Sequence, residues 1–429
     1  MYVCGPTVWN HAHIGNYRPP VVFDVLARVL RAHYPKLTYA RNITDIDDKI
    51  NKAAAEQDVP ITVISERYTK AYHEGLSALG VLPPDVEPKV TDHVAEIHQK
   101  IQLLIDRGHA YVADGHVLFD VPSYSAYGEL SKRNPDELLA GARIDIASYK
   151  KNDGDFVLWK PSADDQPGWD SPWGRGRPGW HIECTAMAAA HLGETIDIHG
   201  GGHDLVFPHH ENERAQSVCA HGKPFVNYWL HNGFLNMNQE KMSKSIGNVL
   251  LVKDLLEQTD GEAIRYVLLS AHYRAPVDWS DDALNQAVAS LDRLYGALRK
   301  VERVGAIQQE PPQAFVDALH DDLNTPKALA ELFAIARQVQ ISEEEDEQAK
   351  LKGQILACGQ LLGLLTKSPA DWFAGDVDAE LVDKLIAQRD EAKKAKDWTT
   401  ADSLRTQLSG LNVVLEDGPA GTTWRIEKR

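Results

Sequence analysis

Residues with metal-binding side chains gather in one stretch, WHIECTAMAAAHLGETIDIHGGGHDLVFPHHENE, which runs from Trp180 to Glu213. His209 and Glu213 are four residues apart, a spacing that places two side chains on one face of a helix, so they can bind one ion together. Cys184 adds a thiol, and thiolate, imidazole and carboxylate are all zinc ligands. A tetrahedral site needs a fourth protein ligand, and Cys4, in YVCGPTVWN at the start of the chain, is the best remaining donor. These four residues predict a zinc site.

The alternative for Cys184 is a buried thiol beside a polar helix start, which is the usual role of a single cysteine. The metal is favoured here because the four donors lie in short stretches punctuated by Gly and Pro, including the turn at Gly200, Gly201 and Gly202.

The elements that must position Cys4 follow from the start of the chain. YVCGPTVWN has the pattern of a buried strand and turn, VVFDVLARVLRAHY that of a helix, and LTYARNIT that of the next strand. Such a β-α-β unit begins a parallel sheet. HAHIGNYRPP is expected to open the helix, with Pro19 and Pro20 in its first turn. The residues from His13 to Gly15 then lie where the strand passes into the helix, the place where α/β folds bind nucleotides.

Three domains are predicted along the chain. Residues 1–280 form an α/β domain with a parallel sheet, interrupted at about 109–175 by an insertion that begins with a hairpin whose turn is Asp114-Gly115. Residues 281–367 form a helical bundle. Residues 377–429 form a small α+β domain of two helices and the hairpin LNVVLEDGPAGTTWRI.

The composition narrows the class of protein. The chain has 429 residues, of which 43% are hydrophobic and 25% charged, as in a soluble globular protein. Its net charge of −17 argues against indiscriminate nucleic-acid binding but not against a nucleic-acid partner held on local basic patches. Four scattered cysteines are too few for a disulfide framework, and no apolar run suggests a membrane span or a signal peptide. We expect a cytoplasmic protein, working as a monomer.

Two motifs then carry a family resemblance. His13-Ile14-Gly15-Asn16 resembles the HIGH signature of class I aminoacyl-tRNA synthetases, and the residues from Lys241 to Ser245 spell their KMSKS loop. The segments YVCGPTVWN, RNITDIDDKI, GRPGWHIEC, GGGHDLVFPHHENE and DGPAGTTW are similar, in the same order, to those of the cysteinyl-tRNA synthetases. The chain departs from that pattern at Asn16, which replaces a histidine, and at Trp9, where a tyrosine is commoner. The family also usually carries a further segment before the first catalytic strand.

The resemblance implies a Rossmann-like catalytic domain and an ATP-dependent, AMP-forming ligase. Joining a carboxylate to the α-phosphate of ATP builds negative charge on phosphoryl oxygens, so the reaction needs positioned cations and N–H donors. Lys241 and Lys244 offer cations, and the resemblance implies that Lys244 contacts ATP, which would be bound with Mg²⁺. His13 and Asn16 can hydrogen-bond phosphate and ribose, while Ile14 and Gly15 shape the turn.

The resemblance also implies a role for zinc in choosing the substrate. Serine and cysteine are near isosteres, which an ordinary pocket separates by only about 10²-fold. Zinc with a vacant coordination position binds a thiolate strongly and an alcohol weakly. Trp180 and His181, beside Cys184, are expected to line the cysteine pocket, and Thr7 to contact the α-amino or carboxylate group. A core position is the equally weighted alternative for Trp180.

The implied partner is a cysteine-specific tRNA, together with ATP and L-cysteine. In DEAKKAKDWTTADSLR, basic residues including Lys393 lie beside Trp398, a pattern that suits phosphate contact and stacking on an unpaired base. Asp402 and Asp417 are further candidates for contacts with anticodon bases. An amphipathic helix with a solvated lysine face is the alternative for this segment.

Two rival functions remain. A ligase that transfers cysteine to an amino sugar, as mycothiol ligase does, would share the catalytic half but lack the final hairpin, so DGPAGTTW argues against it. A non-catalytic zinc-binding scaffold would have no need of the intact HIGN and KMSKS motifs.

Overall fold

Two compact units make up the fold. A computed structural model describes residues 1–132, 148–237, 240–241, 249–374, 379–411, 413–418 and 421–426. The first unit comprises Met1–Lys253 and Ala271–Asp278, and the second comprises Asp254–Ser270 and Trp279–Arg429.

The first unit is built on a four-stranded sheet in the order β2-β1-β7-β8, in which every neighbouring pair is parallel. Helix α1 lies between β1 and β2 in the chain. The predicted α/β fold with a parallel sheet is therefore confirmed. The bounds are Tyr2–Val3 (β1), Ile14–His33 (α1), Ala40–Arg41 (β2), Ile196–Gly202 (β7) and Val226–Asn232 (β8).

The first two strands are shorter than the sequence pattern predicts. β1 ends at Val3 and β2 at Arg41. Pro6 has no N–H to donate to a ladder, and beyond it the two segments meet again only as an isolated parallel bridge between Thr7 and Thr44. The stretch between is a loop at the carboxyl end of β1.

The expected position of the prolines in α1 is wrong. The helix begins at Ile14, so Pro19 and Pro20 lie in its second turn and not in its first. It begins early because Asn16 caps it: the Asn16 Oδ1 atom accepts a hydrogen bond from the His13 N–H over 3.1 Å. Each proline removes an N–H that would otherwise donate to the carbonyl four residues earlier, at Gly15 and Asn16, so this turn lacks two helical hydrogen bonds.

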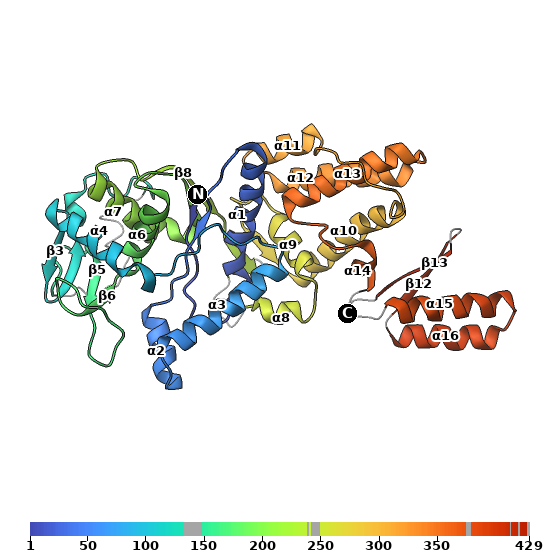
Figure 1. Cartoon of the computed structure of the whole chain (residues 1–429), viewed down its shortest axis with the longest axis horizontal. Helices are drawn as coiled ribbons and strands as arrows, with labels where there is room; N and C mark the ends of the chain where they lie inside the picture. The colour runs from blue at the N-terminus through green and yellow to red at the C-terminus, as the bar shows by residue number, and fades with distance from the viewer. Residues whose placement is uncertain are drawn as a thin grey trace. The chain divides into compact units, whose positions relative to one another are not determined.

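An antiparallel sheet, β3-β4-β5-β6, occupies the insertion between α4 and α6. Asp114 and Gly115 have φ of 48° and 74°, which confirms the predicted two-residue turn between β3 and β4. In Figure 1 this sheet lies beside α4, α6 and α7, and its Phe119 and Trp159 share one buried core with Ile97 and Met187. The bounds are Ala110–Ala113 (β3), His116–Phe119 (β4), Phe156–Pro161 (β5) and Gly176–Pro178 (β6).

The first unit has five further α-helices in its described part. They are Asp48–Gln57 (α2), Ile61–Ala78 (α3), Val94–Asp106 (α4), Trp180–Leu192 (α6) and Glu211–His221 (α7), the last preceded by a wide helical turn at Val206–His210. A small sheet in the order β10-β9-β11 is formed by Leu235–Met237 (β9), Glu240–Lys241 (β10) and Val277–Trp279 (β11).

The second unit is mostly helical and ends in an antiparallel hairpin, β12-β13. Among the described residues, no helix is both long and apolar enough to cross a membrane. The elements of the second unit are Gly261–Leu269 (α9), Asp281–Lys300 (α10), Gln313–His320 (α11), Thr325–Ile341 (α12), Glu345–Leu362 (α13), Pro369–Ala374 (α14), Ala379–Lys394 (α15), Trp398–Gly410 (α16), Val413–Gly418 (β12) and Gly421–Ile426 (β13). Helix α8, Val252–Leu256, leads into this unit.

Arg18 in α1 holds two distant segments of the first unit together. Its side chain is buried, and its Nη1 atom donates to Gly233 O and Phe234 O, each over 2.6 Å. Its Nη2 atom donates to Ala275 O over 2.6 Å and to Tyr273 O over 3.3 Å. Burial lowers the pKa of Arg18 to about 10, so the guanidinium stays charged at neutral pH.

We predict that Arg18→Met lowers the free energy of unfolding by about 3 kcal/mol or more, because it removes several buried hydrogen bonds from a charged donor and leaves the Ala275 carbonyl without the Arg18 contact. Urea denaturation followed by circular dichroism measures the change. Arg31→Met is the matched control on the same helix, since Arg31 pairs with Asp85 at the surface and its loss should cost less than about 1 kcal/mol. Equal losses in the two variants would contradict the role assigned to Arg18.

Candidate active site

Cys4 is positioned by the glycine that follows it. The Cys4 N–H donates to Gly200 O over 3.2 Å, which places the residue at the carboxyl end of β1 and beside β7. The Gly5 N–H donates to Asn42 Oδ1 over 2.9 Å, and a Cβ atom on Gly5 would lie 1.6 Å from the Asn42 carbonyl oxygen. A residue without a side chain is required at this position.

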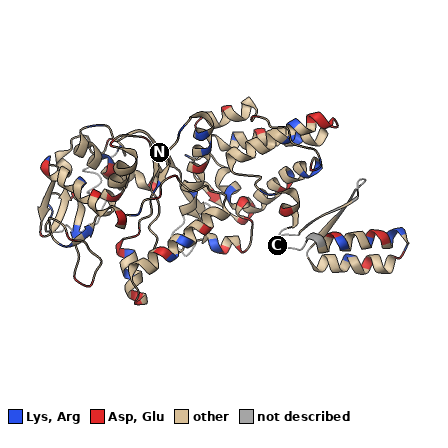
Figure 2. Ribbon diagram, in the orientation of Figure 1, with Lys and Arg blue, Asp and Glu red and all other residues tan. Residues whose placement is uncertain are grey.

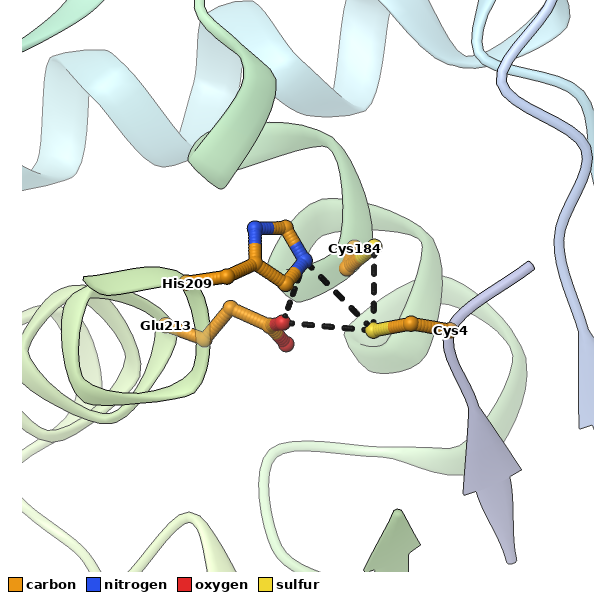
Figure 3. Close-up of side chains that lie close together, drawn as sticks. All are labelled: Cys4, Cys184, His209 and Glu213. Atoms are coloured by element: carbon orange, nitrogen blue, oxygen red, sulfur yellow. Dashed lines mark hydrogen bonds and ion pairs between the residues drawn. The ribbon is translucent and has the colours of Figure 1, made fainter. Parts of the chain in front are cut away.

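The four residues predicted as metal ligands lie together. Cys184 comes from α6, Glu213 from α7, and His209 from the wide turn before α7. Figure 3 shows these side chains and Cys4 pointing toward one another, and their ligand atoms all lie within 4.8 Å. His209 was expected on the same helix as Glu213. It precedes that helix instead, yet its Nε2 atom lies 2.8 Å from Glu213 Oε1.

The spacing of the four donors fits a small tetrahedral ion. With Zn–S near 2.3 Å and Zn–N near 2.0 Å, a tetrahedron has ligand–ligand distances of about 3.3 to 3.8 Å. The Cys4 sulfur lies 3.6 Å from the Cys184 sulfur, 3.5 Å from His209 Nε2 and 3.4 Å from Glu213 Oε1. The shorter contact between His209 and Glu213 is a hydrogen bond, so an ion would move these two side chains slightly apart.

Two further histidines, which the sequence interpretation missed, join the cluster. Cys4, His199, His210 and Glu213 also form a group with ligand atoms within 4.8 Å. The His199 Nε2 atom lies 2.8 Å from Glu213 Oε2, and His210 Nε2 lies 3.5 Å from the Cys4 sulfur. Behind them, His210 Nδ1 contacts His231 Nε2 over 2.7 Å. The sequence could have indicated both residues, because His199 directly precedes the glycine turn and His210 follows His209.

Burial and the contacts within the cluster shift the pKa of each of the four ligand side chains. Burial raises the pKa of Cys4 well above its usual range, and its hydrogen bond to Cys184 adds to the shift. That hydrogen bond lowers the pKa of Cys184 to about 6, against the effect of burial. Although burial disfavours its charge, His199 and His209 hold the pKa of Glu213 well below its usual range. Burial disfavours the charge of His209, but Glu213 and Cys184 together outweigh it and raise the pKa of this side chain to about 10.

Two of the residues expected to line the cysteine pocket, Trp180 and His181, lie against this cluster. Trp180 is 42% exposed and stacks on the His209 ring with a centroid distance of 4.3 Å, so the alternative of a core tryptophan is wrong. The His181 Nδ1 atom lies 3.0 Å from His209 Nδ1. Thr7 lies three residues beyond Cys4, in the bridge with Thr44.

The HIGN residues form the amino end of α1. Ile14 and Gly15 are its first two residues, and Asn16 caps it through His13. The segment after the KMSKS motif pairs with them: Ile14 N–H donates to Leu250 O over 2.9 Å, and His13 forms a bridge with Leu251. The loop after β1 therefore carries Cys4 at one end and the HIGN turn at the other.

The KMSKS residues are described only at their start. Lys241 lies in β10, although its side chain is outside the described part of the chain. Lys244 lies wholly outside the described residues.

The residues expected to contact the anticodon lie on α15, α16 and β12. Lys393 is in the last turn of α15, and Trp398, the first residue of α16, is 61% exposed. Asp402 is exposed on α16, and its carbonyl accepts a hydrogen bond from Thr406 Oγ1. Asp417 lies in β12, and its side chain is outside the described part of the chain. The structure brings Trp398 to the surface, as stacking on a base would require.

We predict that Gly5→Ala disrupts the cluster, because the new Cβ atom would overlap the Asn42 backbone. The free energy of unfolding should fall by about 3 kcal/mol, measured by urea denaturation. Gly296→Ala is the control: a Cβ there meets no atom within 4 Å and should leave stability equal or up to about 1 kcal/mol higher. A Gly5→Ala protein as stable as the wild type would show that the close approach is not restrictive.

Three family models match the chain one after another. Residues 1–289 match the tRNA synthetases class I (C) catalytic domain, residues 314–366 the DALR domain, and residues 377–425 the cysteinyl-tRNA ligase anticodon binding domain. The chain is also similar to the solved structure of Mycobacterium tuberculosis methionyl-tRNA synthetase in complex with methionyl-adenylate. That likeness has a TM-score of 0.59 at 17% identity and covers 84% of this chain and 89% of that one. The predicted class I synthetase fold is thus confirmed.

Relatives in sequence are similar over nearly the whole length. The cysteine--tRNA ligase of Parvibaculum lavamentivorans is 59% identical over 434 residues, which cover 99% of this chain and 93% of that protein. The cysteine--tRNA ligase of Maricaulis maris is 57% identical over 432 residues, with 99% and 94% covered. On this identity and coverage, the chain belongs to the cysteine--tRNA ligase family.

Proposed function

We propose that this chain joins cysteine to its tRNA in two steps. In the first, a carboxylate oxygen of cysteine attacks the α-phosphorus of ATP, the bond to the bridging oxygen breaks, and pyrophosphate leaves. In the second, a hydroxyl of the 3′-terminal adenosine of the tRNA attacks the carbonyl carbon of the adenylate, and AMP leaves. Residues 1–280 would form the catalytic domain, 281–367 the helical bundle and 377–429 the anticodon-binding domain, in line with the order of the family models.

One observation carries the choice of amino acid: Cys4, Cys184, His209 and Glu213 meet at the carboxyl ends of the parallel strands. We propose zinc as the ion, since two thiols with an imidazole and a carboxylate match its preferred ligands and spacing. Bound there, zinc would supply a soft Lewis acid that holds a substrate thiolate more strongly than a serine hydroxyl. Trp180 and His181 would enclose the side chain of the substrate, and Thr7 would contact its amino or carboxylate group.

The nucleotide would bind at the amino end of α1. The positive end of the helix dipole lies there, and Gly15 allows a phosphate to approach the backbone closely. His13 and Asn16 would contact phosphate and ribose, and Mg²⁺ would accompany ATP. Lys241 and Lys244 would neutralise the charge that develops on the phosphoryl oxygens.

The tRNA would be recognised by the last domain. Figure 2 shows basic and acidic residues interspersed along α15, so the contact would depend on a few placed residues and not on a broad basic surface. Lys393 would contact a phosphate, Trp398 would stack on an unpaired base, and Asp402 and Asp417 would accept from base edges.

The four free cysteines suit a reducing compartment, which supports the cytoplasm as the location. The monomeric state stays a prediction.

Pyrophosphate–ATP exchange tests the proposal. Exchange should require cysteine, should not occur with serine, and should be followed by charging of a purified cysteine tRNA. Cysteine-dependent exchange without charging would favour transfer to another acceptor, such as an amino sugar. Absence of exchange in the metal-replete protein would contradict the proposed reaction.

We predict one zinc per chain, lost in Cys184→Ser because a hydroxyl is a much weaker zinc ligand than a thiolate. Metal analysis of the purified proteins measures the content. Cys219→Ser is the matched control, since Cys219 is also buried and free but lies outside the cluster. Full zinc content in Cys184→Ser would show that the ligand assignment is wrong.

We predict that Trp398→Ala raises the KM for tRNA and leaves pyrophosphate exchange unchanged, because losing one base stack costs about 1 to 3 kcal/mol of binding. Initial rates of charging at varied tRNA concentration measure this. Tyr34→Ala is the control, since Tyr34 in the first unit is equally exposed at 61%. An unchanged KM in Trp398→Ala would remove Trp398 from the tRNA interface.

A further inference from the structure

A lysine lies on the buried face of α4. The buried residues of this helix are Ile97, Lys100, Ile101 and Leu104, and the three apolar ones belong to the core of the first unit. Lys100 is only 5% exposed. Burial of an ammonium ion costs free energy, whereas an apolar side chain at the same place would gain it. The amino group of Lys100 therefore needs a chemical reason to be there.

An imidazole lies directly against this amine. The Lys100 Nζ atom is 2.7 Å from the Nε2 atom of His221, which is in the last turn of α7. The other ring nitrogen, Nδ1, lies 3.4 Å from Glu194 Oε1, and Lys223 donates to Glu194 Oε2 over 2.6 Å. A carboxylate beside Nδ1 favours the tautomer that carries its proton there, which directs the Nε2 lone pair at Lys100. Amine, imidazole and carboxylate thus stand in the order of a nucleophile, its base and the group that orients the base.

The same surroundings favour the neutral form of the amine. Burial lowers the pKa of Lys100 from 10.5 to about 8, although Glu194 acts in the opposite direction. At about pH 7.5, this shift raises the fraction of neutral amine about 10²-fold. Burial and the charge of Lys100 lower the pKa of His221, and Glu194 opposes them. Once Lys100 has lost its charge, the pKa of His221 rises, so the imidazole can hold the proton that the amine gives up.

Burial also decides which electrophile can reach the amine. α4 and α7 lie side by side in Figure 1 and are in contact, and Cys219 and Ala220, which precede His221, are buried as well. An acyl phosphate or another charged acyl donor would have to lose its hydration to reach the Nζ atom. Carbon dioxide is small and uncharged, and it reacts with neutral amines but not with ammonium ions. It fits both the access and the protonation state of Lys100.

We propose that Lys100 is a carbamylation site, at which carbon dioxide adds reversibly to the Nζ atom. The Nζ lone pair forms the bond to carbon, one C=O electron pair moves onto oxygen, and His221 Nε2 takes the proton that leaves the nitrogen. The product is a carbamate beside an imidazolium, so the reaction of the neutral pair adds no net charge to the buried site. Glu194 stabilises the imidazolium from its other side. This site is separate from the donor cluster around Glu213, and the proposal does not depend on the tRNA ligase function.

The test exposes the full-length chain to ¹³C-labelled bicarbonate, which equilibrates with dissolved carbon dioxide. The carbamate is trapped by alkylation with a trialkyloxonium salt, and the occupancy of the adduct at each lysine is measured by mass spectrometry of peptides. Occupancy at Lys100 should exceed that at Lys70 at least about tenfold, because only a neutral amine reacts. Lys70 is the reference within the same molecule, since its side chain is 81% exposed.

His221→Gln removes the proton acceptor and keeps a polar side chain. It should lower the occupancy at Lys100 about tenfold or more, because the buried carbamate loses its charged partner. His93→Gln is the matched control: it carries the same substitution at a histidine that contacts His191 instead, and should leave the occupancy at Lys100 unchanged. Lys100→Arg keeps the positive charge and should abolish both the adduct in this peptide and the ¹³C carbamate resonance in the NMR spectrum of the protein.

Wild-type occupancy at Lys100 no higher than at Lys70 would overturn the proposal, as would full occupancy in His221→Gln. If His221→Gln fails to fold, the wild-type comparison between the two lysines decides, together with the carbamate resonance. A resonance that persists undiminished in Lys100→Arg would place the carbamate elsewhere and contradict the assignment.

Discussion

Charges that are buried around one point must balance, because an uncompensated ion inside a protein is strongly destabilising. Glu213 is the centre of that balance here. It is fully buried, and its two carboxylate oxygens lie 2.8 Å from His199 and 2.8 Å from His209. The two thiols close the remaining side, at 3.6 Å from each other. A divalent cation would remove the need for these groups to share protons, and so the same cluster that is costly without an ion becomes a strong ligand set with one.

The helix that carries Glu213 is held from its other side by the insertion. Asn212 accepts a hydrogen bond from Tyr127 Oη over 2.5 Å, and the buried Glu211 accepts from the Ser131 N–H over 2.8 Å. Arg214 donates to the Ala126 carbonyl over 2.9 Å. Three residues of α7, Glu211, Asn212 and Arg214, thus contact the inserted segment, while Glu213 between them faces the donor cluster. These contacts fix α7 and so orient the ligand that it carries, which favours a defined coordination geometry.

Local chemistry in the sequence was enough to predict much of this arrangement. Cysteine, histidine and carboxylate are strong ligands wherever they occur, so the donor set of Cys4, Cys184, His209 and Glu213 could be named from residue type and spacing. The hairpin at Asp114-Gly115 could be placed because the preference of these residues for positive φ is a property of the turn itself. The parallel sheet followed from the alternation of strand and helix patterns, which needs no knowledge of distant contacts.

Tertiary structure alone decided which other residues share the site. His199 and His210 join the cluster because β7 pairs with β1 in the register that places His199 opposite Tyr2, and strand periodicity does not give the register between distant strands. Trp180 is the first residue of α6, and the buried residues of that helix begin at Ile182. Its ring therefore lies on His209 at the surface and not in the core. The short strands also depend on distant residues, because the Gly5 N–H donates to the side chain of Asn42 and not to a backbone carbonyl of the neighbouring strand.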